Sequence, residues 1–491
     1  MKNILVSEQA YIRMPTLILG GSKEFKQHVK IFERIDEMLR VDGVENHLKT
    51  ILIQRIIDSS KSYIDLTDQL KLQKDISRSL RTNIAHSVCG ESFKKFAIRL
   101  ADSNTLQWFC GYDDPIIKKI PGKSKLHTLS KLIPIDILLE TSDYIISKFG
   151  KSSSSLTEKI DLSSLYVDST CVNLNVHHPI DWILLKDAVK TIVKSIKCLR
   201  SHGLKHRISP PDGFIKQANR IVMDMTLSKS HRRNESKKKR KRLFRELKTL
   251  LRTVYGHGVR YVSLLHKEQK EYTLSVAQAE QISDRMINVL DQVDDIIFQA
   301  NERIIGERKV INKTKILSLY EKHTQVYKRG KAGSDVEFGL QLFVAETEQG
   351  LISNWILRKD APQHDSKFIR PCIEALEKAD IKPDDLTGDR GFSAKSVESF
   401  LQNKNVKSNI CPKNRKELKK KLKSKKFKSA ANRRSQTEGR IGILKNNFIG
   451  GVLKSKGFEN QELQVAWSII THNLWVLTRL DAKEQPKYLV A

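Results

Sequence analysis

Three carboxylates stand at positions where catalytic chemistry is often placed. Asp168 ends the β-branched run "LYVD", Asp389 follows "DDLTG" and precedes Arg390, and Glu438 lies in "RRSQTEGRIGILKNNF". A strand that ends and turns sharply suits a cleft at the edge of a sheet. No Cys or His stands beside these acids, and hard carboxylate oxygens suit Mg²⁺, with Mn²⁺ as the alternative ion. We therefore expect Asp168, Asp389 and Glu438 to converge on two divalent ions, an arrangement that serves phosphodiester cleavage or transfer.

Helical geometry gives Glu438 two basic neighbours. At about 100° per residue, Arg434 at i−4 and Lys445 at i+7 share one stripe with Glu438. The adjoining apolar stripe consists of Ile441, Leu444 and Phe448. Glu438 is thus expected at the border of the buried face, where a carboxylate needs a partner. The alternative is a simple i,i+4 pair with Arg434, worth roughly a few tenths of a kcal/mol.

The composition points to a polyanionic partner. The chain of 491 residues carries 88 Lys and Arg against 56 Asp and Glu, a formal net charge of +32. Nucleic acid is favoured over a membrane, because the basic runs are spread along the chain and no apolar run approaches the roughly 20 residues that span a bilayer. The six cysteines form no C-x-x-C pair, so neither a disulfide framework nor a zinc knuckle is indicated. We expect a cytoplasmic, nucleoid-associated protein.

Two basic segments are candidates for contact with DNA. Residues 232–247 hold eight Lys or Arg before Leu243, and residues 413–434 lead directly into Glu438. A solvated charge run is the alternative for the first segment, but it would repel itself, whereas DNA phosphates supply the counter-charge. The predicted DNA-binding residues are Arg434, Lys445, Arg433, Arg440, Lys328, Arg329, Lys331 and Arg390.

Periodicity predicts helices and strands in alternation, hence an α/β layer. Helices are expected over residues 31–80, where 63–80 is a weak helix-turn-helix candidate, and a Ser-rich break follows at 150–159. Residues 165–176 are expected to form a strand pair, and the interval 201–311 is long, polar and helical. Two further strands are expected in "EFGLQLFVAET" and "LISNWILRK".

These segments together resemble the DDE transposases of bacterial insertion sequences, with the closest likeness to ISNCY-type and related cut-and-paste elements. "YVDSTCVNLNVHHPIDWILLKDAV" is similar to the family's first-aspartate segment and "LTGDRGFSAKSVESFL" to its second. The most specific match is the spacing Arg, three residues, Glu, six residues, Lys, formed by Arg434, Glu438 and Lys445. Ala431 stands where the family often has Tyr. The likeness covers most of residues 105–480.

The resemblance implies a ribonuclease-H-like mixed sheet flanked by helices, with Asp168, Asp389 and Glu438 holding two Mg²⁺. It also implies cleavage at the element's terminal inverted repeats, attack of the freed 3′-hydroxyl on target double-stranded DNA, and a homodimer assembled on the DNA ends. The 221 positions between Asp168 and Asp389 exceed what such a core needs. We therefore expect a helical DNA-binding region over residues 1–155, a catalytic domain over 160–200 and 312–482, and a basic helical insertion over 201–311.

Two other functions fit the same residues. A ribonuclease-H-like nuclease would cut DNA without joining it, and a basic DNA-binding relic of a transposase would have no catalysis. Side chains given little weight as catalytic groups are His177, His178, His364, Asp365, Asp360 and Glu321. Trp467 and Trp475 recur on one helix and are expected in the core.

Overall fold

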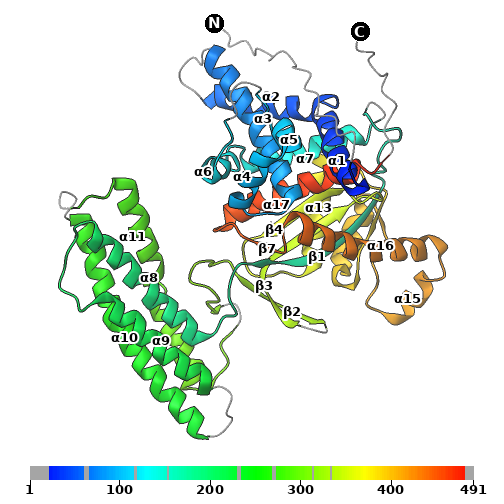
Figure 1. The fold of residues 1–491 in the computed structure, drawn as a ribbon. Coiled ribbons are helices and arrows are strands. Elements are labelled where there is room, and N and C mark those ends of the chain that lie inside the picture. Colours follow the sequence, from blue (N-terminus) through cyan, green and yellow to red (C-terminus); the bar gives the residue numbers. More distant parts are fainter. Residues whose placement is uncertain are drawn as a thin grey trace. The chain divides into compact units, whose positions relative to one another are not determined.

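The computed structural model describes residues 21–59, 66–114, 119–151, 154–228, 234–267, 272–311, 314–331 and 334–480 (Figure 1). The chain is of the mixed α/β class and divides into two compact units. The first comprises Met1–Asn173 and Leu340–Ala491, and the second comprises Leu174–Gly339. Within the described ranges, no helix is long and apolar enough to cross a bilayer.

The first unit begins with helices. They are α1 (Lys23–Arg40), α2 (Val44–Ser59), α3 (Leu66–Cys89), α4 (Phe93–Asp102), α5 (Asn104–Cys110), α6 (Lys123–Leu129) and α7 (Ile135–Phe149). Arg81 of α3 joins them through buried ion pairs with Asp36 of α1 at 2.7 Å and Glu45 of α2 at 2.7 Å. The helix-turn-helix candidate is wrong, because residues 66–80 lie inside the uninterrupted helix α3; residues 63–65 lie outside the described residues.

The described residues also form a seven-stranded mixed sheet. Its strands are β1 (Ser164–Leu174), β2 (Gln325–Lys331), β3 (Ser334–Glu346), β4 (Ile352–Arg358), β5 (Asp385–Thr387), β6 (Lys407–Ser408) and β7 (Val452–Leu453). The order is β2-β3-β1-β5-β6, with β4 also on β3 and β7 also on β1. Strands β3 and β4 pair antiparallel, whereas β1, β5 and β6 run parallel. The expected strand pair at 165–176 is instead the single strand β1, since no turn residue interrupts it.

The same unit holds further helices. They are η3 (Asp365–Phe368), α13 (Ile369–Lys378), η4 (Arg390–Phe392), α14 (Lys395–Asn403), α15 (Arg415–Lys421), α16 (Lys425–Ile443), the π-helical turn η5 (Leu444–Phe448) and α17 (Phe458–Leu477). Of these, α13, α14, α16 and α17 contact the strands of this sheet. The fully buried Asn473 of α17 ties that helix to β4: its amide accepts from Ile352 N and donates to Ile352 O, each at 2.8 Å. Helix α17 also packs on α3 and α7, so the N-terminal helices and the sheet share one unit.

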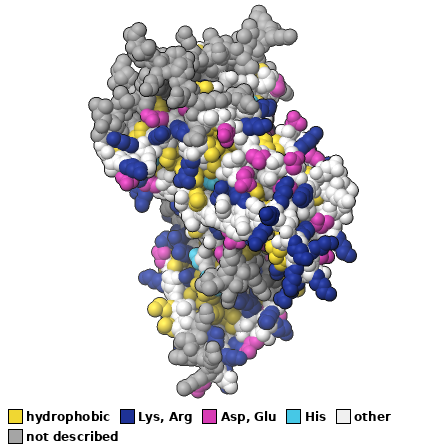
Figure 2. Space-filling view, turned by 90° about the vertical axis from the view of Figure 1, so that its right-hand side faces the viewer, with side chains coloured by type: hydrophobic (Ala, Val, Ile, Leu, Met, Phe, Trp, Pro, Cys, Tyr) yellow, Lys and Arg dark blue, Asp and Glu magenta, His cyan; other side chains and the backbone are white. Residues whose placement is uncertain are grey.

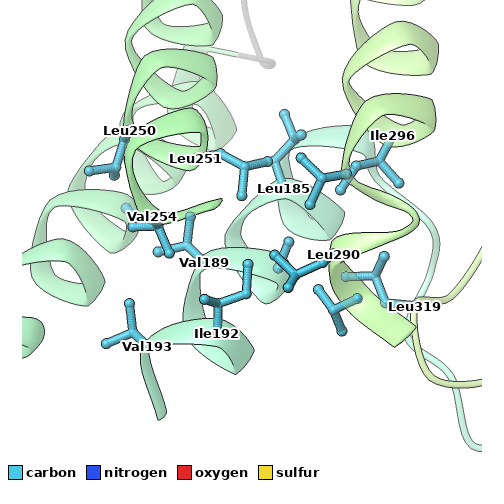
Figure 3. Packing of buried hydrophobic residues seen from close by; sticks show 14 of the residues in the cluster. Leu185, Val189, Ile192, Val193, Leu250, Leu251, Val254, Leu290, Ile296 and Leu319 are labelled. Carbon is cyan, nitrogen blue, oxygen red and sulfur yellow. The ribbon is translucent and has the colours of Figure 1, made fainter. Parts of the chain in front are cut away.

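The second unit is a helical bundle with its own core. Its helices are α8 (Asp181–Ser201), α9 (Pro211–Leu227), α10 (Asn234–Lys267), α11 (Val276–Leu290) and α12 (Val293–Ile304). Figure 3 shows Leu185, Val189 and Ile192 of α8 facing side chains of α10 and α11, all of them buried. Because α8 carries the centre of this core, the unit extends from residue 174 to 339, and the boundaries expected at 201 and 311 fall inside it.

Truncation of Leu251 is expected to destabilise the helical unit. Leu251 of α10 is fully buried, so Leu251→Ala should lower the free energy of unfolding by about 2–5 kcal/mol through lost burial and a residual cavity. The measurement is urea denaturation followed by circular dichroism. The exposed Arg245 on the same helix provides the control, because Arg245→Ala should change the free energy of unfolding by less than about 0.5 kcal/mol. Equal effects of the two substitutions would contradict the packing.

Candidate active site

The sheet places Asp168 beside Asp389. Strands β1 and β5 run parallel with Tyr166 opposite Thr387, so continuing the register by two residues sets Asp168 opposite Asp389. Asp168 Oδ1 accepts a hydrogen bond from Ser169 N at 2.8 Å, and Asp389 Oδ1 accepts from Gly391 N at 2.7 Å. Asp168 lies within β1 rather than at its end, whereas Asp389 lies two positions after the end of β5.

Electrostatics couple the three predicted acids. The pKa of Asp168 is raised to about 6, chiefly by burial, and the negative charges of Asp389 and Glu438 contribute to this rise. The Ser169 N–H and the charge of Arg434 act in the opposite direction. A carboxyl group at this position therefore lacks enough nearby positive charge to offset its burial and its acidic neighbours.

A fourth acid, Asp365, lies at the same place. Its Oδ1 accepts hydrogen bonds from Ser169 Oγ at 2.6 Å and from Gln341 Nε2 at 3.3 Å. A Cβ atom at Gly391 would lie 2.5 Å from Asp365 Oδ2 and 2.9 Å from Asp389 Oδ1, so only glycine leaves room for both carboxylates. Burial raises the pKa of Asp365, and Asp389 adds to this effect. Sequence patterns do not distinguish Asp365 from Asp360. The signal that could have distinguished Asp365 is its place at the start of η3, soon after a strand.

Helix α16 is fixed to the sheet by a buried ion pair. Arg433 and Glu346 are 8% and 2% exposed in their side chains, and Arg433 Nη1 donates to Glu346 Oε1 at 2.9 Å. Thr437 Oγ1 donates to the same oxygen at 2.8 Å, and the other Arg433 nitrogens donate to the carbonyls of Thr347 and Glu348. The guanidinium also lies 4.4 Å from the centre of the Tyr166 ring. These internal contacts argue against the DNA contact that the sequence suggests for Arg433.

From this anchor, α16 and η5 follow the face of β1 that carries Tyr166, Asp168 and Thr170. Glu438, next to the anchored Thr437, comes within electrostatic range of Asp168, and its side chain remains 57% exposed. Arg434 Nη1 lies 3.9 Å from Glu438 Oε1, which is the expected i,i+4 pair. Lys445 Nζ lies 3.5 Å from Thr170 Oγ1. Its place in a π-helical turn differs from the regular helix expected from sequence, and such turns occur frequently at functional sites.

The remaining predicted DNA contacts have different environments. Arg390 is exposed. Arg440 is partly buried: its Nη1 donates to the Glu348 carbonyl at 3.2 Å and lies 3.6 Å from Glu346 Oε1. Gly350, at φ +92°, packs against this guanidinium so closely that a side chain there would collide with it. The side chains of Lys328, Arg329 and Lys331 lie outside the described residues.

A basic surface covers α15 and the first turns of α16. Figure 2 views the chain from the side of these helices and shows Lys and Arg side chains grouped on this face. None of the residues of α15 is buried. The exposed basic side chains of this surface are Lys413, Arg415, Lys416, Lys419, Lys420, Lys423, Lys425, Lys426 and Lys428. Positive charge is thus displayed on the segment that leads into Glu438.

The donor set suits hard divalent cations. Asp168, Asp389 and Asp365 offer only carboxylate oxygens, the ligands that Mg²⁺ and Mn²⁺ prefer, and the raised pKa of Asp168 indicates that a nearby cation would be favourable. In the part of the chain that the structure describes, however, no group of three or more His, Cys, Asp or Glu side chains lies close enough together to hold a metal ion. The exposed Glu438 would have to approach the aspartates to complete such a group.

The weaker histidine and acid candidates lie in other surroundings. His177 lies 3.7 Å from Asp187 and His178 contacts Phe338, all within the helical unit. Asp360 is exposed near Arg358. Trp467 is buried in α17, as the helical periodicity predicts. Among the described residues, the structure thus adds Asp365 to the three predicted acids.

Comparison with known families gives one match. Residues 315–474 match the family model described as a transposase DDE domain. The matched segment includes Asp389 and Glu438, while Asp168 lies upstream of it. No curated protein and no solved structure matches the chain.

Loss of the buried ion pair Arg433–Glu346 should destabilise the fold far more than loss of the partly exposed pair Arg434–Glu438. Arg433→Ala removes the closest cation from the buried Glu346, which keeps Thr437 and the more distant Arg440, and should lower the free energy of unfolding by about 3–5 kcal/mol. Arg434→Ala removes only a partly exposed i,i+4 pair and should cost less than about 1 kcal/mol. Urea denaturation of both variants provides the comparison. Equal stability of the two variants would contradict the anchoring role of Arg433.

The raised pKa of Asp168 predicts a pH-dependent stability. In the folded chain this carboxyl titrates near 6, above its ordinary 3.8, so folding is favoured as pH falls through 6 and this contribution is lost as pH rises through 6. Asp168→Asn should therefore stabilise the chain at pH 7.5 in EDTA by up to about 3 kcal/mol, at roughly 1.4 kcal/mol per pKa unit, and the gain should shrink towards pH 4.5. Urea denaturation across this range measures the difference.

The exposed Asp360 provides the control for this titration. Asp360→Asn should shift the free energy of unfolding little, and by a similar amount at pH 7.5 and pH 4.5. A stability difference between wild type and Asp168→Asn that stays constant across the pH range would contradict the shifted pKa.

Proposed function

We propose that this chain, which belongs to the DDE-type insertion-sequence transposases, uses Asp168, Asp389 and Glu438 to cleave DNA at the ends of its element and to join the freed 3′-hydroxyl to target DNA. The observation that carries this proposal is the juxtaposition of Asp168 and Asp389 on adjacent parallel strands, with Glu438 presented to them by an anchored helix. DNA transposition follows from the family; the residue roles and the reaction steps are proposed.

The strand arrangement supports a ribonuclease-H-like catalytic core. Strand β1 is central, with the antiparallel pair β3 and β4 on one side and the parallel strands β5 and β6 on the other. The first acid lies on β1, the second lies two positions after β5, and the third lies on helix α16, which follows β6 in the chain. This is the distribution that the resemblance implies for such a core.

Asp168, Asp389 and Glu438 would hold divalent ions, either Mg²⁺ or Mn²⁺, with Asp365 as an adjoining carboxylate. When bound, two ions would offset the negative charge of the phosphate and favour formation of the attacking oxygen nucleophile. Ser169 would orient two of the acids, because its N–H donates to Asp168 and its hydroxyl donates to Asp365.

Basic side chains would bring the DNA backbone to these acids. Lys445, beside Thr170 on the Asp168 face of β1, would bind a phosphate next to the reacting one. Arg434 would orient Glu438 through their i,i+4 pair. The basic surface of α15 and α16 would hold the flanking phosphates, a largely sequence-independent interaction.

Recognition of the DNA sequence at the ends of the element would depend on parts of the chain outside the acid site. The basic helix α10 of the second unit and the N-terminal helical region are the candidates for contact with the terminal inverted repeats. Two ends must be brought together for transposition, so we propose a homodimer assembled on DNA.

Substitution of each acid should abolish DNA cleavage while DNA binding survives. With a plasmid carrying the gene and its flanking inverted repeats as substrate, Asp168→Asn, Asp389→Asn and Glu438→Gln should lower the cleavage rate in Mg²⁺ by at least about a hundredfold, because substitutions behind metal ligands already cost 10- to 100-fold. Arg434→Ala should fall in that smaller range. Gel electrophoresis measures cleavage and a mobility shift measures binding.

Asp360→Asn, at an exposed acid, should cleave at the wild-type rate. Cleavage at that rate by Asp168→Asn, or undiminished cleavage in EDTA, would refute the acid triad. A strand-transfer assay with labelled, pre-cleaved ends separates a transposase from a nuclease, since only the transposase yields joined products.

A further inference from the structure

A cavity of about 500 Å³ lies in the first unit, between helices α3, α4 and α6 and the segment from η5 to α17. This volume is within the range of ligand sites in proteins. Aromatic rings form much of its wall, from Phe93, His127, Phe448 and Trp467. The acid site does not include any of these residues.

A partly buried histidine supports the aromatic wall of the cavity. His86 stacks on Phe93, with ring centres 4.2 Å apart and planes at 12°, and its Nε2 has no hydrogen-bond partner among the described residues. Burial lowers the pKa of His86 to about 4, so the imidazole that stacks on Phe93 is neutral at physiological pH.

The charge of the lining favours an anionic ligand. Lys131, Lys454 and Lys456 line the cavity, and both Lys454 and Lys456 are exposed. Glu91 is the acid among the lining residues, and Arg99 binds its Oε1 at 2.7 Å. Flat aromatic walls combined with several lysines match the two parts of a nucleotide, a base that stacks and a phosphate that pairs with cations.

The cavity adjoins the acid site through η5. Phe448, which forms part of the wall, is the last residue of this turn, and Lys445 near its start lies against Thr170 on the Asp168 face of β1. Phe448 lies three positions after Lys445 within this one turn. A DNA strand held at Lys445 therefore has the cavity within reach of its neighbouring nucleotides.

We propose that this cavity receives one unstacked nucleotide of the DNA substrate, with the base between Phe93 and the other aromatic walls and the phosphate on Lys454 and Lys456. The choice of DNA as the ligand rests on the proposed function. Displacing a base from a duplex costs unstacking and unpairing energy, and this cost is smallest for a nucleotide that is already unpaired. A duplex with an extrahelical nucleotide should therefore bind more tightly than a fully paired one.

The test compares two duplexes of the same sequence, with and without a single extrahelical nucleotide, titrated against the full chain in EDTA. Stacking of one base predicts about tenfold tighter binding of the bulged duplex. Phe93→Ala removes a stacking wall, and Lys454→Ala removes an exposed cation without affecting the core; each should bring the affinity ratio towards 1. Lys94→Ala, at an exposed lysine beside Phe93 on α4, should leave the ratio unchanged.

Equal affinity of wild type for the two duplexes would overturn the proposal. So would a ratio that survives in both Phe93→Ala and Lys454→Ala, or one that is lost in Lys94→Ala. Binding in EDTA is independent of cleavage, so Asp168→Asn should keep the preference for the bulged duplex even though it does not cleave. Loss of the preference in Asp168→Asn would assign it to the acid site and overturn the cavity as its source.

Discussion

The ion pair between Arg433 and Glu346 is the interaction on which the geometry of the acid site depends. Glu346 ends strand β3, and its Oε1 accepts from both Arg433 and Thr437 on successive turns of α16. Two contacts on one carboxylate fix both the rotation and the axial position of the helix. Glu438 follows Thr437 directly, so a shift of α16 by one residue would rotate its carboxylate by about 100° away from Asp168. The third acid is thus positioned by a pair that takes no part in the chemistry.

The chain as a whole is strongly basic, whereas the acid site is locally negative. Over the whole chain the net charge of +32 attracts DNA, and the basic surface of α15 and α16 displays part of that charge. Within the site, the negative charge of Asp389 contributes to the raised pKa of both Asp168 and Asp365, whose burial is the main cause. The basic surface would attract a phosphate, whereas the acids without bound cations would repel it. Divalent cations bound to the acids would offset their negative charge and allow the phosphate to approach.

Local patterns in the sequence predicted the parts of the site that depend on neighbouring residues. The strand with Asp168, the turn after Asp389 and the helix spacing of Arg434 and Glu438 are all visible within short windows, and the family match confirms the resemblance to DDE transposases. The metal-ligand roles of these acids stay predictions. Arg433 was interpreted as a DNA contact because an arginine in a basic run is usually exposed.

The remaining features depend on partners that are distant in the sequence. Arg433 is buried by Glu346, 87 positions away, and Asp365 is brought to the site by Ser169, 196 positions away. Helix α8 belongs to the helical bundle because its apolar side chains meet those of α10 to α12, which periodicity within α8 cannot show. Periodicity indicates that a face is buried, but not which element covers it.

The insertion of the second unit between β1 and β3 has a consequence for the order of folding. These strands are neighbours in the sheet, yet β1 ends at Leu174 and β3 begins at Ser334. Closing so long a loop before the strands pair is entropically costly and slows folding. The helices of the second unit contact one another over shorter sequence separations, and once formed they shorten the effective loop. We therefore expect the helical bundle to form early and to act as an internal template that brings the two strands together.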